Sequence, residues 1–428
     1  MTTPAAEGPR GAAGQSAERA AMPGPRRSSA AEWLRHNLFR SSVDAVVTVL
    51  GAVVATVVLY RSVRFVFVTG RWDVVRANLR LLLIGRYPES QTPRLVVAVV
   101  VLGAWAGLIA GIVHARQARA GRPRSGTGRH RVVDLAERLW IPAVVVLLLL
   151  ALTATAGPWI TAAAAVLAAA AGHVAGSALG GRAWGVRTGA AAVLVLASAP
   201  VALHLSVAAA AGYDRWGGFM LNLFLAACAI VLSFPFGVLL ALGRRSRLPV
   251  VRVVSTAYIE LVRACPLFVL LLFAHVALGF FVPQRFTPSA PTRAIIVFTL
   301  FTAAYLAEVV RGGLQSVPKG QFEAARAIGL SPVRQTFLIV LPQALRNVIP
   351  AQIGQLISLF KDTTLAGVAM SLFELLTVTG AVTQQPEFRG QGLIGETIAF
   401  GALLFWAVSY TMSRESQRLE RKLGVGVR

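Results

Sequence analysis

An apolar stretch near residues 346–370 is interrupted by four consecutive polar residues, Lys361, Asp362, Thr363 and Thr364. They follow Pro350 by about 11 residues, which at about 1.5 Å per helical residue places them near the middle of a bilayer. Charged side chains there cost about 2.5–3.5 kcal/mol each on insertion scales, so they usually carry a function. A cation, an anion and two hydroxyls complement a small zwitterion such as an amino acid. The sequence leaves two interpretations open: contact with such a substrate, or an internal ion pair that holds helices together.

Two further pairs of opposite charges fall inside apolar stretches. Glu260 and Arg263 are three residues apart, as are Glu308 and Arg311. This spacing brings both members of a pair to one face of a helix, where they can neutralise each other. We interpret both pairs as structural or gating charges, and we expect Glu374 just outside the membrane.

Enzyme and metal chemistry find no support in the sequence. It shows no paired catalytic carboxylates and no Ser/His/Asp spacing, and its 6 histidines are scattered. Cys228 and Cys265 lack the spacing of metal ligands or of a redox motif, so we interpret them as small buried hydrophobic residues. We therefore expect no enzyme activity, no metal and no cofactor on this chain.

The elements that must position these residues are membrane-spanning helices. The chain of 428 residues is 56% hydrophobic and only 14% charged, and apolar runs of roughly 20 residues, the length that crosses a bilayer, recur along it. Because a bilayer leaves no water to pair backbone groups, such runs form helices, and the predicted fold is an all-α integral membrane protein. We predict about ten spans, with a range of about 8–10. They lie near residues 43–60, 93–113, 140–158, 161–179, 188–211, 217–242, 253–282, 294–315, 346–370 and 394–412.

Arginine distribution orients these spans and divides the chain. The net charge of +24 comes mostly from arginines between apolar runs, as cytoplasmic loops require, so no nucleic-acid partner is expected. We predict a disordered cytosolic tail at residues 1–40, an accessory membrane region at 41–212, a core at 213–415 and a basic cytoplasmic tail at 416–428. The segment 61–94 is arginine-rich on the predicted outer side and is interpreted as an amphipathic interfacial helix. Gly172, Gly176 and Gly180 favour close helix packing, with an Ala-rich low-complexity span as the alternative.

The segment 316–345 is the polar exception between two predicted core spans. Ser316 is a predicted helix cap with Pro318 in the first turn, and Gly329 is a predicted left-handed stop. Ser331 and Pro332 then begin a second short helix. Its apolar face would carry five residues, Val333, Phe337, Val340, Leu341 and Leu345.

The first of these two helices presents small residues, predicted to be exposed, beside a carboxylate. They are Ala324, Ala325 and Ala327, next to Glu323. Such a shape suits docking into a groove of a partner, and it suits equally a plain connector under the helices.

At this point the sequence resembles the permease subunits of ABC transporters. Their EAA loop is a Glu-Ala-Ala followed by a glycine and an apolar helix, and Glu323, Ala324, Ala325 and Gly329 match it one by one. "YIELVRACPLFVLLLF" (258–273), "LPQALRNVIP" (341–350) and "LFKDTTLAGV" (359–368) resemble the polar amino-acid, histidine/glutamine-type branch. "WDVVRANLRLLLIGRYP" (72–88) and "WGGFMLNLFL" (216–225) resemble its long general L-amino-acid subunits. The resemblance implies a five-helix importer core whose cytoplasmic coupling helices dock on a separate ATPase.

This resemblance implies an amino-acid importer in the cytoplasmic membrane that works by alternating access. None of the three lysines sits in a Gly-Lys-Ser/Thr P-loop, so ATP is expected on a partner subunit dimer. The other expected partners are an extracytoplasmic solute-binding protein, membrane lipid, the amino-acid substrate and a second permease subunit, with a heterodimer preferred on the resemblance. The alternative function is an ion-coupled secondary amino-acid transporter or channel, which explains the buried charges but not the two-helix insert.

Overall fold

The computed structural model describes residues 34, 37–119, 156–180, 212 and 215–423. Within them the regular elements are helical, which confirms the all-α class. They are α3 (Ser42–Arg64), η1 (Phe65–Thr69), α4 (Asp73–Ile84), η2 (Glu89–Gln91), α5 (Thr92–Arg119), α7 (Ala156–Gly180), α9 (Gly218–Arg244), α10 (Pro249–Ala264), α11 (Leu267–Leu272), η4 (Phe273–Ala277), α12 (Leu278–Phe281), η5 (Gln284–Phe286), α13 (Ala290–Ser316), α14 (Lys319–Ala327), α15 (Pro332–Arg334), η6 (Gln335–Val340), α16 (Leu341–Asp362), α17 (Leu365–Met370), α18 (Leu375–Val382) and α19 (Ile394–Leu423).

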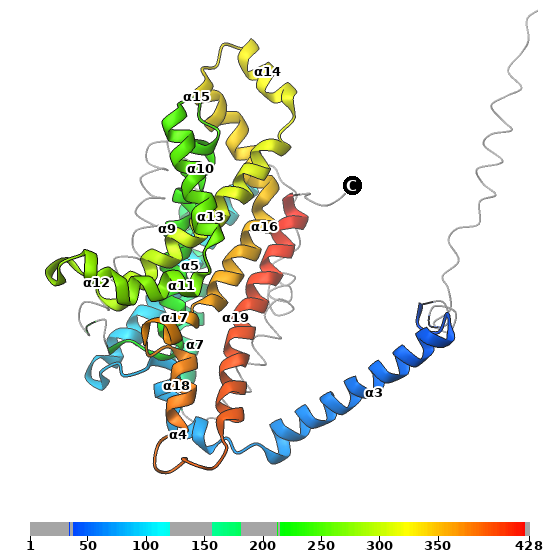
Figure 1. The fold of residues 1–428 in the computed structure, drawn as a ribbon, viewed down its shortest axis with the longest axis vertical. Helices are drawn as coiled ribbons and strands as arrows, with labels where there is room; N and C mark the ends of the chain where they lie inside the picture. The colour runs from blue at the N-terminus through cyan, green and yellow to red at the C-terminus, as the bar shows by residue number, and fades with distance from the viewer. Residues whose placement is uncertain (1–33, 35–36, 120–155, 181–211, 213–214, 424–428) are drawn as a thin grey trace, which may run out of the picture. The chain divides into compact units, whose positions relative to one another are not determined.

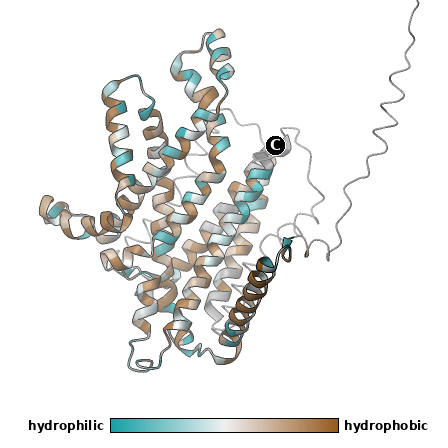
Figure 2. Cartoon of the chain, turned by 45° about the vertical axis from the view of Figure 1, so that its right-hand side comes forward, coloured by the Kyte–Doolittle hydropathy of each residue, from teal (hydrophilic) through white to brown (hydrophobic). Residues whose placement is uncertain are grey.

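In the described part of the chain, six helices are long and apolar enough to cross a membrane, and a bent pair would make a seventh span. The predicted span at 188–211 and most of that at 140–158 lie outside the described residues, so the total of about ten stays a prediction. Hydrophobic residues dominate the long helices, whereas hydrophilic ones gather at their ends (Figure 2). Such a distribution is typical of spans joined by polar connections.

The chain divides into two compact units, Met1–Gly70 and Arg71–Arg428. In the first, the side chain of Ser41 accepts a hydrogen bond from Asp44 N at 3.1 Å and so begins α3. α3 has no buried residue, and Arg61 and Arg64 lie in its last turn. An apolar helix with basic residues at its end has the composition of a lipid-facing span.

Close backbone contact joins α5 and α7 in the second unit. A Cβ built on Gly107 would lie 1.9 Å from Ala169 O, and one built on Gly176 would lie 2.1 Å from Leu108 O. Only glycine permits this approach, because any side chain would push the two helices apart. The prediction of close packing through the glycines of 172–180 is therefore confirmed.

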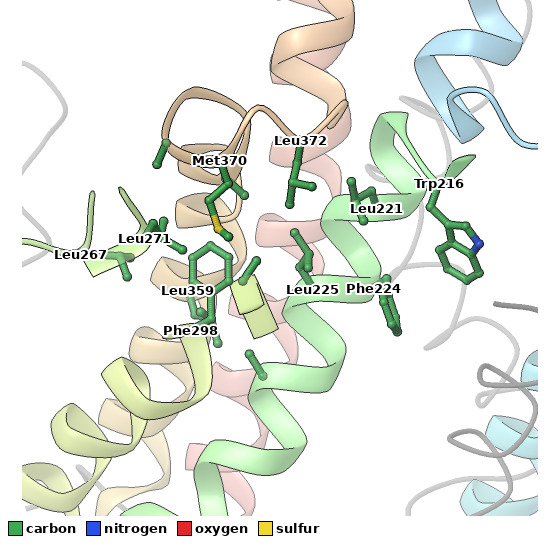
Figure 3. Close-up of a cluster of buried hydrophobic side chains, with 14 of the residues drawn as sticks. Trp216, Leu221, Phe224, Leu225, Leu267, Leu271, Phe298, Leu359, Met370 and Leu372 are labelled. Atoms are coloured by element: carbon green, nitrogen blue, oxygen red, sulfur yellow. The ribbon is translucent and has the colours of Figure 1, made fainter. Parts of the chain in front are cut away.

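The core of the second unit is built around α9. Helix α9 packs along α13, α13 packs along α16, and α16 packs along α19 (Figure 1). A buried cluster gathers side chains of α9, α11, α13, α16 and α17, including Leu225, Leu271, Phe298, Leu359 and Met370 (Figure 3). This cluster holds the last turn of α16, which carries Lys361, against the middle of the bundle.

The predicted span at 253–282 is a broken helix in the structure. α10 ends at Ala264, and the helical run Leu267–Phe281 departs from it at 101°, so that α11 and α12 run sideways (Figure 1). The cause is Pro266: the residue before it, Cys265, has φ −91° and ψ 134°. A proline disfavours the helical conformation of its predecessor, so the helix ends there.

The predicted interfacial helix of 61–94 contains α4, and one face of this helix is buried in the core. Val74, Val75, Leu79 and Leu82 are buried in a cluster with residues of α9, α18 and α19. Gln385 Nε2 donates to Asn78 Oδ1 at 2.7 Å, tying α4 to the loop after α18. α4 thus packs on the core although it lies in the predicted accessory range, and the division at residue 213 stays a prediction.

Candidate coupling segment and substrate site

The coupling segment, residues 316–345, forms two helical pieces joined by a tight corner. α14 spans Lys319–Ala327, and Gly329 follows with φ +76°, the left-handed conformation predicted for it. The side chain of Ser331 accepts from Arg334 N at 3.4 Å, with Pro332 in the first turn. The corner is closed by Leu330 N, which donates to Ala325 O at 3.1 Å.

Two details of the predicted segment are wrong. Ser316 is not the cap of α14: it is the last residue of α13, its hydroxyl donates to Gly313 O, and Pro318 is the capping residue. Because Val317 and Pro318 are extended, α14 starts later than the capping pattern suggested. Ala325, predicted to be exposed, is buried, since Gln335 Nε2 donates to Phe322 O at 3.0 Å and holds α14 down on the following helix.

The outer face of the coupling segment carries small and apolar residues among the exposed charges of Lys319, Glu323, Arg326 and Arg334. Glu323, Ala324 and Ala327 are exposed, and Ile328 is 74% exposed. Val333 and Phe337, two of the five predicted face residues, are also exposed, whereas Val340 and Leu341 are buried. An exposed apolar corner at the end of a bundle is typical of a protein contact surface. α14 lies at the opposite end of the bundle from α4 and α18 (Figure 1).

From Pro332 to Asp362 the backbone is continuously helical. Residues 335–340 form a π-helical turn, and α16 follows without a break. The corner at Gly329 is thus joined to Lys361 by one run of helix. Pro350 lies inside it and removes one backbone hydrogen bond.

Helix α16 exposes a line of small and polar residues, which we call the α16 stripe: Ala351, Gly354, Ser358 and Lys361. Their spacing of three and four residues places them on one face of the helix. A Cβ on Gly354 would meet nothing within 4 Å. Lipid is a poor neighbour for a lysine and a serine, whereas a second helix or a polar pathway suits them.

The structure distributes the four predicted substrate residues over different environments. Lys361 is exposed at the end of the stripe and Asp362 is half-buried, and neither makes a salt bridge within the described residues. Thr364 Oγ1 donates to Lys361 O at 2.9 Å. Thr363 is fully buried and donates to Phe360 O at 2.7 Å. An internal salt bridge, the alternative interpretation, is not formed by these two charges in this structure.

Behind Thr363 lies a buried polar network that sequence reasoning missed. Asn222 Nδ2 donates to Thr363 Oγ1 and to Glu374 Oε2, both at 3.1 Å. Glu374 is 0% exposed and caps α18 by accepting from Leu376 N and Thr377 N. Glu374 lies between α17 and α18, and burial raises the pKa of its carboxyl although these hydrogen bonds oppose the rise. An amide inside the apolar α9 is costly to bury, which is the signal that could have revealed Asn222.

The two predicted local ion pairs form one larger cluster. Arg311 Nε and Nη2 donate to Glu308, as predicted. Glu260 does not pair with Arg263: Glu260 binds Arg244 at 2.8 Å, while Arg263 lies 3.7 Å from Glu308. Arg244 also binds Glu308. The ion-pair cluster therefore joins α9, α10 and α13, and three guanidinium groups face two carboxylates. The last turn of α9, which holds Arg244, is 64 residues away from Glu308 in sequence, so spacing could not predict this contact.

The arrangement agrees with comparisons to known proteins. A family model described as "Binding-protein-dependent transport system inner membrane component" matches residues 233–425. The probable glutamine ABC transporter permease protein GlnP of Bacillus subtilis is 37% identical over 210 residues, which cover 91% of GlnP and 48% of this chain. The chain belongs to this family. This permease is therefore a multi-pass protein of the cytoplasmic membrane.

Two relatives that are longer than GlnP also match the permease. The inner membrane amino-acid ABC transporter permease protein YhdY of Escherichia coli K12 is 42% identical over 212 residues, 50% of this chain and 57% of YhdY. The glutamate/glutamine/aspartate/asparagine transport system permease protein BztC of Rhodobacter capsulatus is 44% identical over 210 residues, 49% of this chain and 48% of BztC. The match thus spans about half the length of these two relatives.

Proposed function

We propose that this permease is the membrane-spanning subunit of an ATP-driven importer of polar L-amino acids. The observation that carries the proposal is the outer face of the coupling segment: Glu323 and Ala324 beside the exposed apolar corner of Ile328 and Phe337. Exposed apolar residues on a built, hydrogen-bonded corner suit a protein partner. The names of GlnP, YhdY and BztC supply the amino-acid class.

In this mechanism a separate ATPase subunit dimer docks on the coupling segment. ATP-driven closure of that dimer moves α14 and the helical run that starts at Pro332, and the bundle changes between outward-open and inward-open packing. The proposed pathway follows the α16 stripe toward Lys361 and Asp362, where the ammonium and the carboxylate are free of salt bridges within the described residues. These two groups complement the carboxylate and the ammonium of an amino acid.

The stripe also suggests where a second permease subunit, in a heterodimer by preference, would meet this one. Small residues allow two helices to approach closely, and Lys361 would then face the shared pathway instead of lipid. An extracytoplasmic solute-binding protein would deliver the substrate on the side of α4 and α18, opposite α14.

The proposal is tested by co-purification and by uptake. A tagged chain is co-expressed with a candidate ATPase subunit, a candidate second permease and a candidate binding protein, and uptake of a panel of radiolabelled polar L-amino acids is measured in vesicles. We expect accumulation only when ATP is supplied on the side of the membrane that carries the ATPase. We expect Ala324→Trp to abolish uptake and the recovery of the ATPase subunit with the tagged chain. Gln417→Trp is the matched control, because Gln417 is exposed on α19 toward the same end of the bundle.

Two results would reject the proposal. Accumulation driven by an ion gradient without ATP would favour a secondary transporter or channel. Full ATPase recovery and uptake in the Ala324→Trp variant would remove the coupling role of α14.

A further inference from the structure

The buried side-chain amide of Asn222 joins the substrate segment, residues 361–364, to α9 and to the start of α18. Asn222 is 0% exposed in the apolar helix α9. Its Nδ2 donates to Thr363 Oγ1 and to Glu374 Oε2 at 3.1 Å each, and its Oδ1 accepts from Leu375 N at 3.0 Å. Both ends of the amide are thus bonded to segments more than a hundred residues away. A buried amide is tolerated only when its donors and acceptor are satisfied, as they are here.

We call Asn222, Thr363 and Glu374 the junction. Both carboxylate oxygens of Glu374 are occupied by hydrogen bonds, so neither is free to bind a solute. Oε2 accepts from Leu376 N and Oε1 from Thr377 N and Thr377 Oγ1. A Cβ on Gly367 would lie 2.3 Å from Glu374 Oε1, so α17 closes the remaining side. Phe373 O accepts from Gly218 N at 2.8 Å, which fixes the same segment to the start of α9.

The position of this junction gives it a role in transport. Thr363, one of its members, directly follows Lys361 and Asp362 at the end of α16, and its side chain points into the network and not toward the exposed face of Lys361. The direction in which Lys361 and Asp362 leave the helix is therefore set by how the next residue is held. Among the described hydrogen-bond partners of Asn222, Glu374 is the one with a charged side chain.

We propose that Asn222 is a positioning residue for the substrate: it fixes the turn after Lys361 and Asp362 against the capped start of α18. The proposal rests on the proposed import function and assigns to Asn222 no contact with the substrate. Loss of the hydrogen bonds of the Asn222 side chain leaves the charges of Lys361 and Asp362 in place but no longer fixes their orientation. Substrate binding should therefore weaken while the complex still assembles.

The test is a charge exchange across the Asn222–Glu374 contact. N222D places a second carboxylate about 3.1 Å from Glu374, and two buried carboxylates at that distance repel each other or must share a proton. We expect N222D to raise the half-saturating concentration for uptake about tenfold, because the repulsion displaces the turn that positions Lys361 and Asp362. In N222D/E374Q the Gln amide can donate to the Asp carboxylate, and we expect the half-saturating concentration to return most of the way to that of wild type.

The readouts separate positioning from folding. Uptake by the complete complex is measured for the amino acid of the panel that wild type accumulates fastest, and the amount of assembled complex is quantified in the same vesicles. A raised half-saturating concentration with unchanged maximal rate per complex, and its reversal in the double variant, is the expected result. N222A introduces no charge, and we expect the same kind of change, several-fold in size, from it. N222A keeps the proposal testable if N222D fails to assemble.

Three results would overturn the inference, and they differ from one another. A maximal rate that falls only with the amount of complex, at constant half-saturating concentration, would make Asn222 purely structural. N222D and N222A transport equal to wild type would remove any role. Absence of ATP-driven uptake by the wild-type complex would overturn the proposed function together with this inference, a result visible before any variant is made.

Discussion

Adjacent glycines of α13, Gly312 and Gly313, should respond in opposite directions to the same substitution. A Cβ on Gly313 would lie 2.6 Å from Ala344 O and from Val348 Cγ1, against 3.4 Å for ordinary contact. Ala344 O belongs to the backbone of α16, so α13 and α16 must separate by about 0.8 Å. A Cβ on Gly312 would meet nothing within 4 Å.

These distances set the size of the effect. Overpacking typically costs about 1–3 kcal/mol, and replacing glycine by alanine in a helix gains about 1 kcal/mol. Gly313→Ala should therefore destabilise the protein by roughly 0–2 kcal/mol, while Gly312→Ala should stabilise it by about 1 kcal/mol. The two variants differ in stability by about 1–3 kcal/mol although the same methyl group is added one residue apart.

Thermal unfolding in detergent, followed by tryptophan fluorescence, measures the difference. We expect the order of apparent Tm to be Gly312→Ala above wild type and wild type above or equal to Gly313→Ala. Equal Tm values in the two variants, or a Gly313→Ala variant more stable than Gly312→Ala, would refute the close contact of α13 with α16. Because that contact supports the start of the coupling segment, Gly313→Ala should also lower ATPase recovery.

Three further predictions concern the corner, the ion-pair cluster and the substrate segment. Gly329→Ala costs about 1–2 kcal/mol because the left-handed backbone is strained for alanine, so ATPase co-purification should fall, whereas Gly320→Ala in α14, with no neighbour within 4 Å, should leave it intact; equal recovery would contradict the corner's role. Glu308→Gln removes the anion shared by three arginines and should lower the apparent Tm by several degrees, an effect that the exposed control Glu387→Gln should not show; matching melts would refute the cluster's contribution. Lys361→Gln should raise the half-saturating concentration for uptake without reducing the amount of complex, and unchanged uptake kinetics would exclude Lys361 from the site.

Local signals in the sequence predicted the local structure well. Apolar runs gave the long helices, Gly329 gave the left-handed corner, and Ser331 with Pro332 gave the second helix start, because each depends on residues within one or two turns. The break at Cys265 was also readable, since a proline restricts the residue before it. The continuous apolar run of 253–282 instead favoured the prediction of one span without a break.

Contacts between distant segments were not predictable in the same way. The three-residue spacing predicted a pair of Glu260 with Arg263, but the Glu260 carboxylate binds Arg244 of another helix. Asn222 and Glu374 are 152 residues apart, and the packing of α9 against the start of α18 brings them together. Pairing rules along one helix describe neighbours on that helix and carry no information about which other helix lies alongside.

The unbroken helix from Pro332 to Asp362 has a mechanical consequence. At about 1.5 Å per residue it is a lever arm about 46 Å long, with one end at the corner and the other at Lys361. In the proposed mechanism, a movement of the corner reaches the substrate site without a relay of side chains, because a single piece of backbone connects the two. The lever has compliant points at the widened turn 335–340 and at Pro342 and Pro350, which lack a backbone N–H. In the proposed mechanism, stiffening these points should transmit more of the movement to Lys361, and softening them should lower the amount of substrate transported per ATP hydrolysed.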